Sequence, residues 1–330
     1  MKAAAARAHA NFALVKYWGK RDAALNLPAV GSISITLDGL ASTTRVVFDP
    51  DLTADTVTLD GRTDPGTTIK VSATLDLLRA RAGLDWRARV ESGNDFPTAA
   101  GLASSASGFA ALVVAADAAL GLGLSPGELS GLARRGSGSA ARSIFGGFVE
   151  MARGERADGR DAVARPLLEA DAWPLRVVIA VTDRGGKSVS SRDGMERTAA
   201  TSPYFPAWVA GADADLAEAR AAIAERDFDR LAEVSEFSCL KMHASALAAR
   251  PGVLYFNGAT VEAIHALRAL RRDGVPVFFT VDAGPQVKAV CLPGAEALVA
   301  ESLGATTGVI DVLRTGLGPA AAVVDDRAPC

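Results

Sequence analysis

A run of small residues from Pro97 to Ser107 precedes a long alanine-rich apolar stretch, as in a loop that enters a buried helix. Gly101 can adopt backbone angles that side chains forbid, so backbone N–H groups of the loop can approach a ligand closely. Serines at a helix start can cap it and donate hydroxyls, and the unpaired N–H groups there attract anions. The pattern predicts a loop that binds a triphosphate without a Walker-type lysine, although an ordinary serine-capped helix also fits it.

Two lysines, Lys16 and Lys20, lie close together in the segment ANFALVKYWGKR at residues 10–21. The segment has the pattern of a strand end followed by a turn. Two neighbouring ammonium groups repel each other, and a polyanion such as a diphosphate or a carboxylate between them removes that repulsion. We therefore expect an anionic ligand here, with a solvated basic turn as the alternative.

Three further segments combine small residues with a charged side chain. Residues 135–143 read RGSGSAARS, whose amides and hydroxyls suit phosphate and whose Arg142 offers a planar fork to a carboxylate. Residues 187–195 read KSVSSRDGM and again place serines beside an arginine. Residues 279–285 read FTVDAGP and place Asp282 at a strand end before a tight turn. Taken singly, these patterns also occur in flexible loops, capped helix starts and simple turns.

The elements that must position these residues mix strands and helices. Short alternating runs in the first 60 residues predict strands, and residues 104–121 predict a central buried helix because they carry little polar surface. Apolar runs predict buried strands at 175–181, 276–281 and 287–292. Three helices are predicted at 213–226, 228–245 and 260–272. Because strands and helices do not alternate regularly and no internal repeat is visible, the order favours the α+β class.

Length and composition narrow the class of protein. The chain has 330 residues, more than one core usually supports, so we predict two domains at 1–174 and 175–330. Hydrophobic residues make up 49% and charged residues 22%, which indicates a globular chain, and the formal charge of −3 argues against a nucleic-acid partner. No stretch is long enough to span a membrane, and Cys239, Cys291 and Cys330 have no metal-like spacing. We therefore expect a cytoplasmic protein with free thiols.

The stretch from Pro97 to Ser107 resembles the second motif of the GHMP kinase superfamily, Pro-x-x-x-Gly-Leu-x-Ser-Ser-Ala. The resemblance implies a ribosomal-protein-S5-like N-terminal domain and a ferredoxin-like C-terminal domain, with the active site in the cleft between them. It also implies that this loop and a later lysine bind ATP. The implied ATP-binding residues are Pro97, Ala100, Gly101, Leu102, Ala103, Ser104, Ser105, Ser107 and Lys187.

The segment at 10–21 and the three charged segments, taken in order, look like those of diphosphomevalonate decarboxylases. That family phosphorylates the 3-hydroxyl of mevalonate 5-diphosphate with MgATP, then expels phosphate and carbon dioxide to leave isopentenyl diphosphate. The resemblance implies Asp282, Lys16 and Arg142 as catalytic residues, and Ser105 as a ligand or near neighbour of Mg²⁺. It implies a homodimer that needs no organic cofactor. The implied substrate-binding residues are Tyr17, Trp18, Gly19, Lys20, Ser137, Gly138, Ser139, Ala140, Arg142, Ser191, Arg192 and Met195.

Some positions depart from the family pattern. Residues 29–32 read AVGS where a Thr-Asn-Ser-Ser-like run is common, and Gln286 stands where Asn is usual. Lys70 stands near where an arginine that contacts substrate phosphate is expected. The alternatives are therefore a decarboxylase of mevalonate 5-phosphate, a mevalonate 3-kinase, which should lack the Asp282 and Lys16 pair, and a non-catalytic ligand-binding homologue.

The three histidines show no metal-ligand spacing. His243 lies where the family often has histidine, and we expect a structural role for it. His265 is expected on a helix surface.

Overall fold

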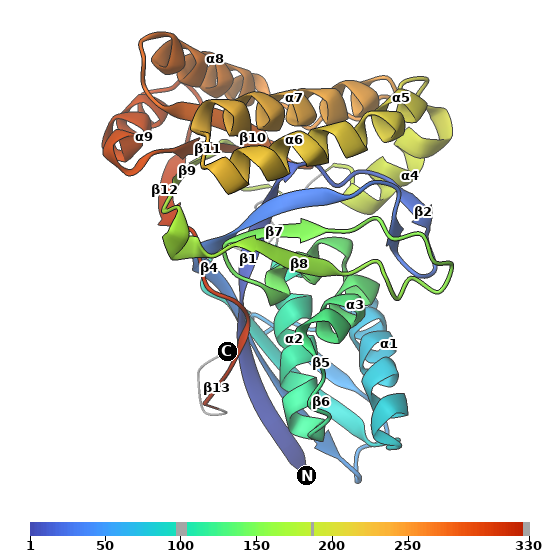
Figure 1. The fold of residues 1–330 in the computed structure, drawn as a ribbon. Coiled ribbons are helices and arrows are strands. Elements are labelled where there is room, and N and C mark those ends of the chain that lie inside the picture. Colours follow the sequence, from blue (N-terminus) through green and yellow to red (C-terminus); the bar gives the residue numbers. More distant parts are fainter. Residues whose placement is uncertain (97–103, 186–187, 326–330) are drawn as a thin grey trace.

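Two long antiparallel strands, β1 and β4, run through the N-terminal half of the chain and carry its first sheet (Figure 1). The computed structural model describes residues 1–96, 104–185 and 188–325. The sheet has the order β13-β1-β4-β6-β5, and β7 pairs with both β4 and β8. The strands are β1 (Lys2–Val15), β4 (Ser32–Asp49), β5 (Thr56–Leu59), β6 (Arg87–Asn94), β7 (Phe148–Met151), β8 (Ala164–Leu168) and β13 (Ala322–Val324).

Helix α2 (Ser104–Leu120) packs against β1 and β4 and is covered by α1 (Pro65–Ala82) and α3 (Pro126–Gly136). Because it lies between the sheet and two helices, it is apolar on nearly every side, and Ala110, Val113 and Ala115 are fully buried. The short helix η1 (Gly138–Ile144) follows α3 directly. The sheet and the buried helix thus place the start of α2 beside η1.

The C-terminal half is built on an antiparallel sheet of order β10-β11-β9-β12, covered by helices (Figure 1). Its strands are β9 (Arg176–Val181), β10 (Val277–Val281), β11 (Val287–Cys291) and β12 (Asp311–Gly316). The helices are α4 (Ser191–Thr201), α5 (Phe205–Ala210), α6 (Ala212–Glu225), α7 (Phe228–Leu247), α8 (Gly258–Arg272) and α9 (Glu296–Gly304). The small hairpin β2 (Lys20–Asp22) and β3 (Leu27–Pro28) completes the strands of the described residues.

One hydrophobic core joins the two halves. It contains Phe12 and Ile35 from the first sheet, Ile179 and Phe278 from the second, and Leu216 from α6, all of them buried. Since side chains of both sheets interdigitate in this core, the halves are held in a defined relation and the space between them has fixed walls.

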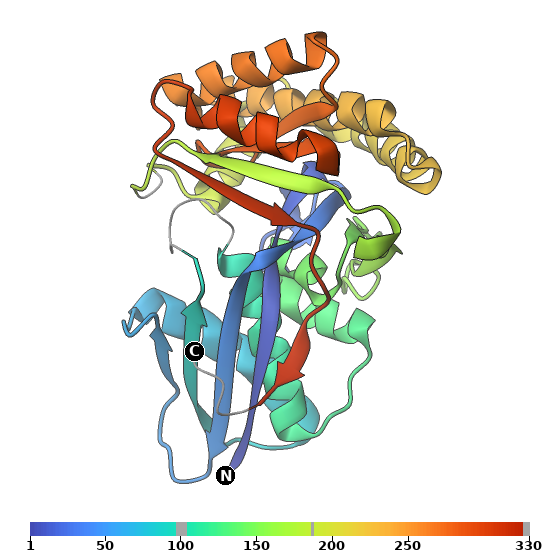
Figure 2. The same cartoon turned by 90° about the vertical axis from the view of Figure 1, so that its left-hand side faces the viewer.

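The α+β class predicted from the sequence is confirmed, and the predicted buried helix, the three later helices and the three apolar strands are all present with bounds that differ by at most two residues. The pattern analysis did not identify α1 and β6. It also missed β13, which returns from the second sheet to pair with β1, so that the first and the last strand of the described residues lie side by side (Figure 2). The division at residue 174 stays a prediction. No helix in the described ranges has both the length and the apolar character that crossing a membrane requires.

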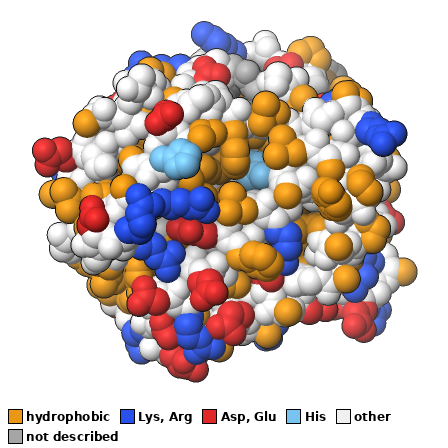
Figure 3. Space-filling model, turned by 90° about the horizontal axis from the view of Figure 1, so that it is seen from above, with side chains coloured by type: hydrophobic (Ala, Val, Ile, Leu, Met, Phe, Trp, Pro, Cys, Tyr) orange, Lys and Arg blue, Asp and Glu red, His pale blue; other side chains and the backbone are white. Residues whose placement is uncertain are grey.

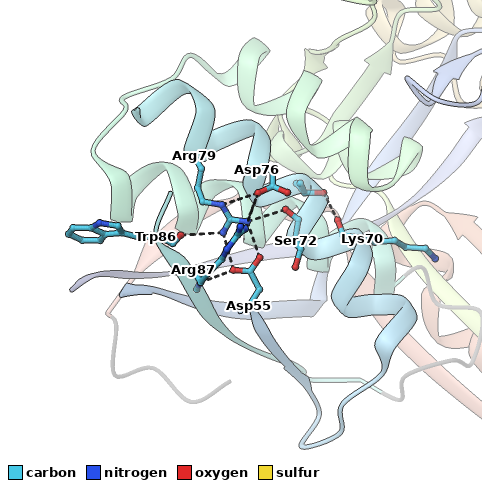
Figure 4. Close-up of polar contacts among 9 residues, drawn as sticks. Asp55, Lys70, Ser72, Asp76, Arg79, Trp86 and Arg87 are labelled. Atoms are coloured by element: carbon cyan, nitrogen blue, oxygen red, sulfur yellow. Dashed lines mark hydrogen bonds and ion pairs between the residues drawn. The ribbon is translucent and has the colours of Figure 1, made fainter. Parts of the chain in front are cut away.

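A buried ion cluster fastens α1 to the edge of the first sheet (Figure 4). The Arg79 guanidinium donates to both carboxylate oxygens of Asp55, at 3.0 and 2.9 Å, and both side chains are only 3% exposed. Asp76, at 58% exposure, accepts a further bond of 2.7 Å from Arg79. Burial works to raise the pKa of Asp55, but hydrogen bonds from Arg79 and the Ala88 N–H outweigh it and lower the pKa.

We predict that Asp55→Ala lowers the free energy of unfolding by about 3 kcal/mol or more, because it leaves the buried Arg79 charge without its bidentate partner. Urea denaturation followed by circular dichroism measures the change. Asp76→Ala is the matched control, since it removes the exposed partner of the same arginine and should cost less than about 1 kcal/mol. Equal losses in the two variants would contradict this account.

Candidate active site

A cavity of about 490 Å³ is lined by both halves of the molecule. It brings together, from segments far apart in the sequence, most of the predicted substrate and catalytic residues that the structure describes. Its lining includes Lys16, Tyr17, Trp18, Lys20, Lys70, Ser105, Ser137, Gly138, Ser139, Arg142, Ser191, Arg192, Asp193, Met195 and Asp282. Five of these side chains are basic and two are acidic, so the cavity suits an anionic ligand.

Some of the predicted substrate-binding and ATP-binding residues do not line the cavity. Ala140 is fully buried in the core beside α2, and Gly19 packs against the Phe205 ring, so neither presents a side chain to the cavity. The Ser107 hydroxyl is also buried and lies 2.7 Å from the Ser42 hydroxyl, beneath the start of α2. Its geometry is therefore that of a packing contact and not of an ATP contact. Outside the described residues lie the predicted ATP contacts Pro97, Ala100, Gly101, Leu102, Ala103 and Lys187.

Asp282 follows β10 directly, at the point where the second sheet meets the cavity. Its Oδ1 accepts a 2.7 Å hydrogen bond from the ammonium of Lys16, which stands at the end of β1 and also donates to the Ala13 carbonyl at 2.8 Å. Lys16 is 2% exposed and Asp282 25%. The pair predicted from the sequence is therefore formed, and it links the first sheet to the second.

A second lysine, Lys288 of β11, reaches the same carboxylate: its ammonium lies 3.3 Å from Oδ2 of Asp282. Burial would raise the pKa of Asp282, but the charges of Lys16 and Lys288 and their hydrogen bonds outweigh it and hold that pKa well below its usual range. Pattern analysis missed Lys288. The available signal was a single lysine inside the apolar strand VKAVC, where a charge must find a partner.

Arg142 stands on η1 with its side chain fully enclosed. Neutral acceptors orient it: Asn11 Oδ1 accepts two of its N–H groups at 3.1 and 3.3 Å, and the Ser32 hydroxyl accepts a third at 2.7 Å. None of the described carboxylates lies within ion-pair distance of this guanidinium. Burial lowers the pKa of Arg142 to about 10, opposed by Asp282. A buried cation that lacks an ion-pair partner at a cavity wall is poised for an anionic ligand.

Tyr17 contributes a hydroxyl group to the cavity lining. Its hydroxyl is buried against Gly138 and has no hydrogen-bond partner among the described residues. Burial raises the pKa of Tyr17 to about 12, although Arg142 and Arg192 act in the opposite direction. The hydroxyl therefore stays protonated near neutral pH and can donate to a ligand oxygen.

The remaining basic side chains form the outer part of the cavity. Burial lowers the pKa of Lys20, and the positive charges of Arg192 and Lys70 lower it further, while Glu196 opposes them. Lys20, Lys70 and Arg192 come from β2, α1 and α4, so three elements direct positive charge at one space. Such mutual repulsion is relieved when a polyanion binds.

At the start of α2, the Ser105 hydroxyl lies 3.5 Å from the Ser137 hydroxyl that precedes η1. Two hydroxyls and the first N–H groups of a helix therefore converge at the cavity wall, an arrangement that suits phosphate oxygens. The described residues contain no group of three His, Cys, Asp or Glu side chains placed to hold a metal ion. A magnesium ion here would therefore depend on the phosphates that accompany it.

Helix α7 contacts the backbone at Lys16 and beside Asp282. The Ser238 hydroxyl accepts the Lys16 backbone N–H at 3.0 Å, and the Cys239 sulfur accepts the Val281 N–H at 3.2 Å. His243 Nε2 lies 3.1 Å from the Val281 carbonyl, which fits the structural role expected for this histidine. The contacts of Cys239 and His243 fix Val281, the residue before Asp282, and the contact of Ser238 fixes Lys16. The sequence pattern had not indicated the contacts of Ser238 and Cys239.

The departures from the family pattern fit this structure. Gln286 accepts the Thr182 N–H at 2.6 Å and donates to the Asp183 carbonyl, so it fastens the turn after Asp282 to β9. Ser32 holds Arg142 as described above. A side chain at Gly31 would meet Leu216 of α6 at 2.6 Å, so the small residue permits the close packing of that helix.

The α+β fold with its cationic cavity is that of the GHMP kinase class of enzymes. Within that class, residues 8–164 match the model of the diphosphomevalonate decarboxylase-like N-terminal domain, and residues 177–305 match that of the mevalonate 5-diphosphate decarboxylase C-terminal domain. The chain belongs to the diphosphomevalonate decarboxylase family.

Relatives and solved structures agree with this assignment. The diphosphomevalonate decarboxylase of Candida albicans is 38% identical over 86% of this chain and 83% of its own length, and the human enzyme is 38% identical over 83% and 73%. The Staphylococcus aureus mevalonate diphosphate decarboxylase structure is 40% identical, covers 98% of both chains and superposes with a TM-score of 0.92. A structure of MDDEF with MVAPP, AMPPCP and magnesium is 39% identical, covers 98% of this chain and 99% of its own, and has a TM-score of 0.90.

The buried histidine gives a prediction about acid stability. Burial, with the charges of Lys16 and Lys288, lowers the pKa of His243 to about 3, whereas an exposed histidine titrates near 6.5. Between these values the unfolded chain binds a proton that the folded protein excludes, so stability falls as the pH drops below 6.5. This group should cost about 2 kcal/mol between pH 6.5 and 5.0.

We predict that His243→Gln, which keeps an amide donor for the Val281 carbonyl, reduces the loss of stability over this pH interval. Urea midpoints at pH 6.5 and 5.0 measure the difference. His265→Gln, at an exposed position of α8, is the matched control and should keep the wild-type pH dependence. A wild-type loss that His243→Gln does not reduce would contradict the assignment.

Proposed function

We propose that this chain converts mevalonate 5-diphosphate and ATP into isopentenyl diphosphate, ADP, phosphate and carbon dioxide. The observation that carries the proposal is the Asp282 carboxylate, held by two buried ammonium groups at the wall of a cationic cavity. Membership of the diphosphomevalonate decarboxylase family supports the substrate, and the related complex with MVAPP and AMPPCP supports the use of ATP.

Asp282 would orient the 3-hydroxyl for phosphorylation. Its low pKa keeps it ionised at all working pH values, and it also makes the carboxylate a weak base. In a loose phosphoryl-transfer transition state the hydroxyl proton leaves late and would pass to an oxygen of the transferred phosphate, so accepting a hydrogen bond and aligning the oxygen matter more than early proton removal. Lys16 would stabilise negative charge near the same oxygen.

Arg142 would bind the substrate carboxylate with its outward N–H groups, because its other N–H groups are already engaged by Asn11 and Ser32. When phosphate leaves carbon 3, the bond between the adjacent carbon and the carboxylate breaks. Its electron pair forms the new alkene, and carbon dioxide departs. Lys20, Lys70 and Arg192 would hold the diphosphate, which keeps the substrate in place during both steps.

ATP fits the start of α2, where Ser105 and Ser137 lie beside the first N–H groups of the helix. We propose Ser105 as a neighbour of Mg²⁺ in the bound nucleotide. When bound with the nucleotide, Mg²⁺ would supply positive charge that neutralises the phosphate oxygens. The loop at 97–103 and Lys187 remain part of the proposal as predicted from the sequence motif.

The alternatives are less well supported. A 3-kinase was expected to lack the Asp282 and Lys16 pair, and this chain forms it at 2.7 Å. A non-catalytic homologue would have no need for two buried ammonium groups at one carboxylate. The three basic residues of the outer cavity favour a diphosphate over a monophosphate, because each added phosphate charge finds a cation.

We predict that Asp282→Asn lowers kcat by roughly 10²–10⁴-fold, because the amide keeps the shape and loses the charge that orients the hydroxyl. The assay measures ADP release together with trapped labelled carbon dioxide, on mevalonate, its 5-phosphate and its 5-diphosphate. Asp193→Asn, a change of the same kind in the same cavity, is the control and should retain far more activity.

Carbon dioxide in step with ADP from the diphosphate alone is the expected wild-type result. ADP without carbon dioxide would make the protein a kinase, and equal turnover of the monophosphate would revise the substrate. Absence of turnover on all three compounds would point to a binding protein.

We also propose that the chain forms a homodimer in the cytoplasm, as the family resemblance implies. Seen from above, hydrophobic side chains gather among charged ones on the helical face of the C-terminal half (Figure 3). Exposed large hydrophobic residues of these helices include Phe237 of α7 and Val261 of α8, at 57% and 41% exposure. Sedimentation equilibrium that gives a monomer mass would remove the dimer from the proposal.

A further inference from the structure

Lys288 occupies an unusual place for a charged side chain. It lies in the middle of β11, between neighbours that are all apolar, and its side chain is 3% exposed. A lone ammonium in such a setting is costly unless it is paired. Among the described residues, Asp282 is its one acidic partner within 4 Å, at 3.3 Å from Oδ2.

The two lysines hold different oxygens of one carboxylate from different elements. Lys16 binds Oδ1 from the end of β1, and Lys288 approaches Oδ2 from β11. Because β11 pairs directly with β10, and Asp282 follows β10, the strand register fixes Lys288 beside the aspartate. With both oxygens engaged, rotation of the carboxylate about its last bond loses a contact, so one orientation is favoured.

We propose that Lys288 is a positioning residue of the reaction: it holds the second oxygen of Asp282 so that the carboxylate meets the substrate hydroxyl in one orientation and in its ionised form. The inference rests on the proposed function. Asp282 is 25% exposed, so part of the carboxylate remains open to the cavity while both lysines are bound. Lys288 is not among the residues that line the cavity, and it acts through Asp282.

The charged groups around Asp282 determine in which direction its pKa changes when Lys288 is removed. Titratable and charged groups face it from β1, η1, α7 and β11, and these groups are Lys16, Arg142, Cys239, His243 and Lys288. The two lysines are the strongest of the charges that lower the pKa of Asp282, while burial acts to raise it. Removing Lys288 therefore raises that pKa, and the carboxylate takes up a proton at a higher pH.

Lys288→Met tests the proposal because methionine has a similar length and no charge. We expect kcat for the diphosphate substrate to fall about 10–100-fold, as reacting groups lose their alignment, with KM changed less than about threefold. Steady-state kinetics at neutral pH measure kcat and KM separately, and this split between the two constants is the readout that tests the proposal.

Lys241→Met is the matched control. Lys241 also pairs with a buried aspartate, Asp215, at 2.6 Å, but neither residue lines the cavity. This variant should keep the wild-type kcat and KM even where its melting temperature changes. Circular dichroism establishes that each variant is folded, and Lys288→Gln replaces Lys288→Met where the latter does not fold.

The possible outcomes distinguish a failure of this inference from a failure of the proposed function. A folded variant at Lys288 with wild-type kcat, or with a KM that rises as much as kcat falls, would overturn the inference. The first result shows no role, and the second shows a structural one. Wild-type protein that releases no carbon dioxide would refute the proposed function and the inference with it, whereas wild-type turnover beside an unaffected variant refutes the inference alone.

Discussion

The contact between Asp282 and its two lysines is the constraint on which the rest of the site depends. Each partner comes from a different strand, and Lys16 belongs to the first sheet whereas Asp282 and Lys288 belong to the second. Burying three charges is tolerated only when their geometry is accurate, because misplaced partners leave a desolvated charge unpaired. The shared hydrophobic core and the hydrogen bonds from α7 supply that accuracy.

The cavity tolerates an excess of positive charge by two different means. Deep in the cavity, Arg142 is held by neutral oxygens of Asn11 and Ser32, which orient it without neutralising it. At the outer wall, Lys20 and Arg192 repel each other across solvent, where the cost is smaller. Both arrangements carry unfavourable electrostatic free energy. A bound polyanion lowers this free energy, so the placement of the cations favours a polyanionic ligand.

The sequence motifs predicted correctly the residues that lie at the ends of strands. Asp282 and Lys16 each follow a strand, and short signals such as a turn or a glycine mark such positions, so their convergence on one cavity was foreseeable. Residues that act from within elements gave no such signal. Asn11 and Ser32 are small polar residues inside strands, and Lys288 interrupts an apolar strand whose other residues dominate the pattern. In helix α1, Val71, Leu75 and Leu78 are buried on one face, but Arg79 is buried beside them and is tolerated there only because Asp55 pairs with it, so the sequence pattern was weak.

The strength of the ion cluster also bears on how the two chemical steps share one site. A carboxylate with a low pKa is a poor proton acceptor, so the site gives up base strength at Asp282. In return, the carboxylate keeps its negative charge beside carbon 3 when phosphate departs and positive charge develops there. A stronger base would be protonated after the first step and would offer no such stabilisation in the second. The lysines that weaken Asp282 as a base therefore preserve it as an electrostatic partner throughout both steps.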